Sequence, residues 1–257
     1  MSEDLKNNTS LRNSHEVYLA EKSSRPGNMA FKLSVLRKAI DLAILIISGI
    51  LYSTIFPPLN FDFYAWFSLV PLFFLVRGRS YLEAFTRGLI WGYVSGLSSF
   101  IWLREIEVFV PFLVAIFLSF FPAVWCVAIP FIERYIFYPE DVICGGFEKM
   151  RVYREANQHG INWNIKDIHF ALILASLWTF IEWVRSWLLS GLPWNLTAVS
   201  QWRNPAIIQI CDITGVYGVS FVIVLLNIAI CVTAAKSKTM IYHGRFRRPA
   251  ALYFSFV

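Results

Sequence analysis

Long apolar runs, separated by short polar connections, dominate the pattern of hydrophobic and polar positions along this chain of 257 residues. A transmembrane helix needs about 20 consecutive, mostly apolar residues. Six runs are candidates for such helices, at 39–56, 61–76, 84–103, 108–131, 169–188 and 215–234. A seventh apolar run begins at Pro249 and reaches Val257 after roughly 9 residues, too few to span a bilayer, so we expect a truncated last span.

The period of these runs predicts the fold class. A spacing of 3.6 residues suits each long run, and the sequence contains no internal repeat, nucleotide loop or zinc motif. We therefore predict an all-α membrane protein, a polytopic helical bundle with six full transmembrane spans and a truncated seventh. Residues 1–38 are expected to form a hydrophilic, disordered cytoplasmic tail, and residues 39–257 the transmembrane domain, with a cytoplasmic linker at about 138–167.

Composition agrees with a membrane protein. Hydrophobic residues make up 57% of the chain and charged residues only 16%, with a mean hydropathy of +0.54, well outside ordinary soluble proteins. The tail has no apolar core near Met1, so it does not look like a secretory signal peptide. The first apolar run would instead act as an uncleaved signal anchor.

The distribution of lysine and arginine predicts the orientation, because positively charged loops are retained in the cytoplasm. The tail and the connections on its side carry most of these residues: Lys6, Arg12, Lys22, Arg25, Lys32, Arg37, Lys38, Arg77, Arg79, Arg134, Lys149, Arg151, Arg154, Lys166, Lys236, Lys238, Arg245, Arg247 and Arg248. The opposite connections hold little beyond Arg104 and Arg203. We expect a cytoplasmic N-terminus, and we attribute the net charge of +6 to topology and anionic lipid rather than nucleic acid.

The four cysteines show neither CxxC nor His/Cys metal-ligand spacing: Cys126, Cys144, Cys211 and Cys231. Cys126 and Cys231 fall inside apolar runs, where packing is the simplest role. We expect no metal, no cofactor and no disulfide.

The stretch EWVRSWLLSGLPW, residues 182–194, places two charges at the end of the fifth apolar run. Trp178, Glu182 and Arg185 follow an i, i+4, i+7 spacing and share one helix face. An unpaired charge at bilayer depth costs about 2.5 to 3.5 kcal/mol on insertion scales. This face should therefore point into protein or water.

Spacing alone leaves two interpretations of these charges open. In the first, Glu182 and Arg185 form an interfacial pair with tryptophan anchoring, which is common at helix ends. In the second, the Arg185 guanidinium donates two hydrogen bonds to a lipid phosphate at the outer leaflet. Trp194 would line the same opening towards the lipid, which we call the Arg185 mouth. Gly191 would then end the helix, and Pro193 would fix the turn that directs Trp194.

Longer stretches around these residues carry a family resemblance. ASLWTFIEWVRSWLLSGLPWNLTAVSQ, followed by AIIQICDITGVYGVSFVIVLLN, resembles the membrane domain of bacterial apolipoprotein N-acyltransferases. FPPLNFDFYAWFSLVPLF is similar to the end of that family's first span and to its second, and RGLIWGYVSGLSSFIWL is similar to its third. The resemblance covers about residues 40–257 with the order of motifs intact.

The resemblance implies an activity in the bacterial inner membrane. Enzymes of that family transfer an acyl chain from a phospholipid to the N-terminal diacylglyceryl-cysteine of lipoproteins, through a cysteine thioester. A Glu base, a Lys that stabilises the oxyanion and the Cys nucleophile belong to a nitrilase-like domain inserted between the seventh and eighth spans. We therefore expect the catalytic residues beyond residue 257, or in a separately encoded nitrilase-like domain, and this chain alone to be inactive.

The resemblance also implies roles for single residues. Arg185 and Trp194 match positions that line a lipid-access mouth, and Glu182 matches an acidic motif position. Tyr217 lies in GVYGVSF, where glycine-mediated helix packing explains the motif as well as substrate contact does. Cys144 and Cys211 do not match the nucleophile, because Cys144 precedes two glycines on the cytoplasmic side and Cys211 falls on a membrane-domain position.

A different class of function is the alternative. A small multispan transporter or a lipid-binding scaffold would use the Arg185 mouth without covalent chemistry. A transporter normally carries ionisable residues near the middle of the bilayer and often an inverted repeat. The notable charges of this chain instead lie near helix ends.

Overall fold

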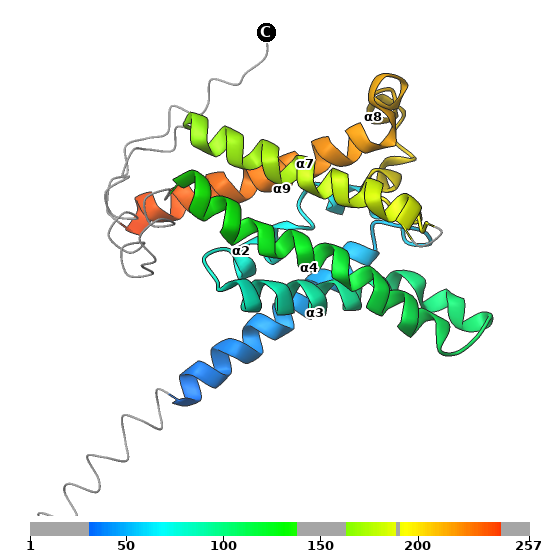
Figure 1. Cartoon of the computed structure of the whole chain (residues 1–257), viewed down its shortest axis with the longest axis horizontal. Helices are drawn as coiled ribbons and strands as arrows, with labels where there is room; N and C mark the ends of the chain where they lie inside the picture. The colour runs from blue at the N-terminus through cyan, green and yellow to red at the C-terminus, as the bar shows by residue number, and fades with distance from the viewer. Residues whose placement is uncertain (1–30, 138–162, 189–190, 243–257) are drawn as a thin grey trace, which may run out of the picture. The chain divides into compact units, whose positions relative to one another are not determined.

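The computed structural model describes residues 31–137, 163–188 and 191–242. Within these ranges every regular element is a helix, as predicted, and residues from Leu45 onward form one compact unit. The elements follow in the order: a helix over 31–53, η1 Asp62–Trp66, α2 Val70–Val76, α3 Tyr81–Phe100, η2 Ile101–Glu105, α4 Val110–Phe137, α7 Ile165–Trp187, η4 Thr197–Gln201, α8 Pro205–Ile208 and α9 Cys211–Tyr242 (Figure 1).

Among the described residues, three helices are long and apolar enough to cross a membrane: Val110–Ile136, Ile165–Trp187 and Cys211–Ser237. The chain is therefore a helical membrane protein, although the predicted six full spans are not reached on these criteria. Within the described residues the first helix covers 31–53, which includes positions before the predicted start of the first span at 39. The tail before residue 31, the linker residues 138–162 and the truncated seventh run lie outside the described residues.

The predicted second span, 61–76, is not one continuous helix, which corrects the sequence prediction. A 3₁₀ turn, η1, precedes the short helix α2, and the buried side chain of Asn227 on α9 bridges the break. Its Oδ1 accepts from the Leu69 N–H at 2.9 Å, and its Nδ2 donates to the Ala65 carbonyl at 2.8 Å. Broken helices persist in membranes where neighbouring groups satisfy the freed backbone in this way.

Helices α3 and α4 run alongside one another (Figure 1), and three glycines of α3 allow the close contact. A Cβ atom on Gly88 would lie 2.6 Å from the Cα of Ala123, and one on Gly92 would lie 2.5 Å from the Cγ of Pro122. Gly96 continues the stripe one turn later, with a Cβ position 3.3 Å from the backbone of α4. Small residues at a four-residue spacing allow helix backbones to approach closely.

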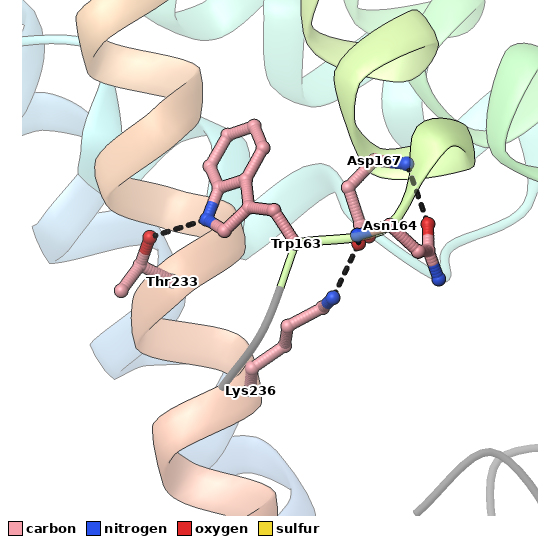
Figure 2. A network of polar contacts seen from close by, with 5 residues as sticks. All are labelled: Trp163, Asn164, Asp167, Thr233 and Lys236. Carbon is pink, nitrogen blue, oxygen red and sulfur yellow. Dashed lines mark hydrogen bonds and ion pairs between the residues drawn. The ribbon is translucent and has the colours of Figure 1, made fainter. Parts of the chain in front are cut away.

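Polar contacts join the start of α7 to the far part of α9 (Figure 2). Asn164 caps α7, because its Oδ1 accepts from the Asp167 N–H at 2.9 Å while Asp167 accepts from the Asn164 N–H at 2.8 Å. Lys236 donates to the same Asp167 carboxylate, and Trp163 Nε1 donates to Thr233 at 3.2 Å. The last residues of the predicted linker thus belong to this cap and to the first turn of α7.

Further contacts join the opposite ends of the helices. Gln201 Nε2 donates to the Asp62 carbonyl at 3.0 Å, and Trp202 Nε1 donates to Asn60 Oδ1 at 2.9 Å. These two contacts hold η4 and the residue after it against η1 and the loop that precedes η1. Further along the chain, helix α9 bends at Gly215, whose φ of 67° is left-handed.

Candidate functional site

Glu182, on the second turn from the end of α7, is a buried carboxylate with an exposed fraction of only 4%. One of its oxygens, Oε1, accepts from the Thr197 N–H at 2.7 Å, the Thr197 hydroxyl at 2.7 Å and Trp178 Nε1 at 3.2 Å. A buried charge needs such partners, because its desolvation is otherwise very costly. The carboxylate therefore fastens the first residue of η4 to the face of α7.

The Thr197 hydroxyl links this carboxylate to two aromatic side chains. Because its single proton goes to Glu182, its oxygen accepts from the Tyr52 hydroxyl at 3.0 Å and from Trp178 Nε1 at 3.1 Å. Tyr52 comes from the first helix and Trp178 from α7, so the network ties three segments that are distant in sequence.

Arg185 does not pair with Glu182, although the two lie three residues apart on one helix. Its Nη2 donates instead to the carbonyl oxygens of Trp194 and Asn195, at 3.1 and 3.3 Å. Among the described residues no ion pair joins the two charges, so the predicted interfacial Glu–Arg pair does not form. Both side chains instead position the segment that follows α7.

Gly191 does not itself end α7, as the sequence suggested, because α7 ends at Trp187 with Leu188 as its C-cap, and Gly191 lies in the turn that follows. Gly191 has a left-handed φ of +78°, and a Cβ atom there would lie 2.2 Å from the Ser186 carbonyl oxygen. The Leu192 N–H donates to the Arg185 carbonyl at 3.0 Å, which returns the chain towards the helix end. Only glycine adopts this backbone without strain.

Trp194 lies beside the ends of α3 and η2. Its ring stacks on Phe100, with centroids 6.1 Å apart, and tilts against Trp102 at 5.9 Å. Phe100 is buried, whereas Trp194 remains 46% exposed. The rings of Phe100, Trp102 and Trp194 thus form an aromatic edge, in which Trp102 and Trp194 are exposed at the surface of the protein.

A cavity of about 60 Å³ lies between α3, α4 and α7 beside this aromatic edge. Apolar side chains and the stripe glycines form most of its wall, including Phe100, Phe121, Gly92 and Gly96. Its polar lining includes Glu182, Arg185 and Trp91. Each of these three carries a buried polar atom without a hydrogen-bond partner: Glu182 Oε2, Arg185 Nε and Trp91 Nε1.

The structure brings together three of the four predicted site residues. Glu182 and Arg185 line the cavity, and Trp194 is adjacent through Asn195 and Phe100, which line it too. Tyr217 is half-buried on α9, two residues after the Gly215 bend, and does not line the cavity. Its contact with substrate stays a prediction.

Sequence reasoning missed three residues of the site: Tyr52, Trp91 and Thr197. Trp91 and Thr197 lie inside the stretches that carry the family resemblance, RGLIWGYVSG and PWNLTAVSQ, and this resemblance was the signal that could have identified them.

No group of three or more side chains suited to a metal ion occurs in the part of the chain that the structure describes.

Comparisons with known proteins point to one family. The family model for the apolipoprotein N-acyltransferase N-terminal domain matches residues 48–229. The apolipoprotein N-acyltransferase of Geobacter metallireducens is 26% identical over 194 residues, which cover 74% of this chain and 33% of the relative. That of Thermotoga maritima is 26% identical over 193 residues, 75% of this chain and 35% of the relative.

A shorter and more similar segment relates the chain to the apolipoprotein N-acyltransferase of Rickettsia prowazekii. The two are 42% identical over 59 residues, which are 23% of this chain and 12% of the relative. The chain therefore matches between 12% and 35% of the length of these three relatives.

Proposed function

The chain belongs to the apolipoprotein N-acyltransferase N-terminal domain family, and from this premise we propose that it forms the lipid-binding membrane part of an enzyme that N-acylates lipoproteins. The observation that carries the proposal is the cavity lined by Glu182 and Arg185 beside the exposed ring of Trp194. An apolar cavity with a few fixed polar groups is the usual form of a site for an amphipathic ligand.

The proposed reaction transfers an acyl chain from a phospholipid to the N-terminal diacylglyceryl-cysteine of a lipoprotein through a cysteine thioester. The chemistry needs an activated thiolate and an oxyanion donor. Cys126 and Cys231 are buried in the helix core, an environment typical of inert packing cysteines rather than of reactive thiolates. We assign the Glu, Lys and Cys of the reaction to a nitrilase-like domain, either further along the same polypeptide or encoded separately. We expect the 257-residue chain alone to be inactive.

In this proposal the protein lies in the bacterial inner membrane with its N-terminus in the cytoplasm. The helix over residues 31–53, the broken 61–76 segment and α3 join the three long apolar helices to complete six spans, followed by a seventh from 249. The concentration of lysine and arginine on one side supports this orientation. Arg185 and Trp194 then lie at the outer leaflet, where the acyl donor and the lipoprotein meet.

Arg185 is the residue that we propose to meet the lipid headgroup. Its Nη2 is engaged by two backbone carbonyls, which hold the guanidinium in place beside Trp194. A positioned guanidinium binds phosphate more strongly than a mobile one, because less side-chain entropy is lost. Tyr217 is proposed as a further substrate contact on α9.

Genetic complementation tests this function. In a strain depleted of its own lipoprotein N-acyltransferase, the 257-residue chain should fail to restore growth. It should restore growth when a nitrilase-like domain and last span, taken from the Geobacter metallireducens relative, are supplied with it. Restoration of N-acylation by the chain alone would refute our assignment of the catalytic residues.

We call the chain supplied with the nitrilase-like domain and last span the completed enzyme. Its Arg185→Ala variant should lose N-acylation, measured by mass spectrometry of lipoprotein N-termini. Arg104→Ala is the matched control, because Arg104 is exposed and its ion pair within the described residues is with its neighbour Glu105. Liposomes that contain the chain alone test the alternative, a transporter. Lipid or solute movement that Arg185→Ala abolishes would favour that alternative.

A further inference from the structure

Three buried polar atoms around one cavity have no hydrogen-bond partner within the protein. They are the acceptor Glu182 Oε2 and the donors Trp91 Nε1 and Arg185 Nε. Glu182 is 4% exposed and Trp91 only 1% exposed, and the Nε atom of the half-buried Arg185 is itself buried. Because native proteins pair nearly all buried polar groups, three orphans on one cavity indicate a ligand that completes them.

The donors and the acceptor restrict the chemistry of that ligand. A phosphate or an ester carbonyl offers only acceptors, and neither can satisfy the Glu182 carboxylate. An ammonium group offers only donors, and it cannot satisfy the two N–H groups of Trp91 and Arg185. A hydroxyl both donates one proton and accepts through two lone pairs, which matches one acceptor and two donors.

The surrounding contacts hold the three groups in place. Glu182 Oε1 accepts three hydrogen bonds, so the orientation of its second oxygen is set. Arg185 Nη2 is held by two carbonyls, and the Trp91 ring packs against Tyr52 with centroids 4.9 Å apart. A site whose polar groups are fixed before binding loses little entropy when the ligand enters.

The rest of the wall indicates what carries the hydroxyl. Phe56, Leu118, Phe121 and Pro122 line the cavity, together with Gly92 and Gly96 of α3. The volume of about 60 Å³ exceeds the roughly 10 to 15 Å³ that one water molecule needs, so a hydroxyl and several adjoining carbon atoms fit. The ligand is therefore an alcohol attached to hydrocarbon.

We propose that this cavity binds the free glycerol hydroxyl of a single-chain lipid, and that it prefers such a lipid to one in which the hydroxyl is absent. The inference rests on the proposed function. When a phospholipid ester gives up its acyl group to a thiol, the C–O bond breaks, and the glycerol oxygen keeps its electrons and takes the thiol proton. The lipid that leaves then carries the hydroxyl that the cavity fits.

Binding of defined lipids to the full chain in detergent micelles, followed by native mass spectrometry, tests the inference. The probes are 1-palmitoyl-lysophosphatidylethanolamine, its 2-deoxy analogue and 1-monopalmitoylglycerol. We expect the hydroxyl lipid to bind at least about tenfold more tightly than the deoxy analogue, because the analogue loses the three hydrogen bonds of the hydroxyl. Equal binding of this pair would overturn the inference and leave the cavity to water.

The third probe distinguishes the two sources of the hydroxyl. Equal affinity for monopalmitoylglycerol and the lysophospholipid would mean that the hydroxyl and chain alone are recognised. Tighter binding of the lysophospholipid would mean that its phosphate contributes from outside the cavity. Both results support the inference, whereas failure of monopalmitoylglycerol to bind at all would contradict it.

Trp91→Phe removes one donor of the site. Because the indole N–H has no partner within the protein, this variant breaks no hydrogen bond of the protein, and any fall in its midpoint of thermal unfolding comes from the smaller buried ring. The preference for the hydroxyl should fall, because only the bonds to Glu182 and Arg185 remain. Trp163→Phe is the matched control at the far end of α7, and it should keep the preference although it loses the bond to Thr233. An unchanged preference in Trp91→Phe would refute the site.

These outcomes are separate from those of the proposed function. If the completed enzyme N-acylates lipoproteins but the lipid pair binds equally, the inference fails and the function stands. If the hydroxyl preference holds while complementation fails, the cavity is a lipid-alcohol site of a non-enzymatic protein. The wild-type lipid comparison is decisive even if Trp91→Phe does not fold.

Discussion

Replacing Asn227 by leucine should destabilise the helix bundle by removing the bridge across the broken second segment. Asn227 is 1% exposed, and leucine has a similar volume, so the change removes polarity with little change in packing. The Leu69 N–H, now bonded at 2.9 Å, loses its side-chain partner, and the Ala65 carbonyl, now bonded at 2.8 Å, keeps only the Ser68 hydroxyl, which donates to it at 3.3 Å. The Ile223 carbonyl also accepts from Asn227 Nδ2, but it lies inside α9.

The expected magnitude follows from those two groups. Leaving the buried Leu69 donor unpaired costs about 1 to 3 kcal/mol, and the bond that the Ala65 carbonyl loses adds about 0.5 to 1.5 kcal/mol, which makes about 1.5 to 4.5 kcal/mol together. Leucine recovers part of this through its own apolar burial, at most about 1.5 to 3 kcal/mol for a complete side chain. The middle of the first range is about 3 kcal/mol and that of the second about 2 kcal/mol, so we expect a net loss of about 1 kcal/mol in the free energy of unfolding.

The assay is reversible unfolding in mixed micelles with increasing denaturing detergent, followed by circular dichroism. Ile230→Leu is the matched control, because Ile230 is on the same helix, is 37% exposed and keeps its volume. Amide hydrogen exchange gives a second measurement, since the Leu69 amide should lose protection in the Asn227→Leu variant alone. A change below about 0.5 kcal/mol, with Leu69 still protected, would refute the reasoning.

Three further substitutions have expected outcomes in the same unfolding assay. Gly92→Val should cost about 1 to 3 kcal/mol or prevent folding, because its Cβ would lie 2.5 Å from Pro122, and unchanged stability would contradict the glycine contact. Gly191→Ala should cost at least about 1 to 2 kcal/mol for the left-handed backbone alone, and a red-shifted tryptophan emission should accompany it. Thr197→Val should cost about 1 to 3 kcal/mol, because Glu182 loses a donor and Tyr52 an acceptor, whereas Thr86→Val, at an exposed position, should have little effect.

Part of the site could be predicted from sequence because it depends on local geometry. The 3.6-residue period alone places Glu182 and Arg185 on one face of α7, and both line the cavity. The position of Gly191 before a proline predicted a turn, and its φ of +78° has the expected sign. Such features need only the chain within a few residues of them.

The partners of those residues could not be predicted in the same way. Spacing left a pair between Glu182 and Arg185 as one of two interpretations, but Thr197, fifteen residues away in sequence, supplies two donors to the carboxylate. Trp91 reaches the cavity because the glycines of α3 bring that helix close to α4. Hydrogen bonds of this kind depend on how helices pack, which a local period does not contain.

The sequence by itself determined the class of the protein and the position of its long helices. Apolar runs of spanning length have one stable form in a bilayer, where each backbone group must bond within its own segment, so α4, α7 and α9 follow directly from hydropathy. The tertiary structure decided where that rule is broken. The 61–76 run is apolar enough to be mistaken for one helix, and it ends as two pieces because Asn227, more than 150 residues later, satisfies the backbone at the break.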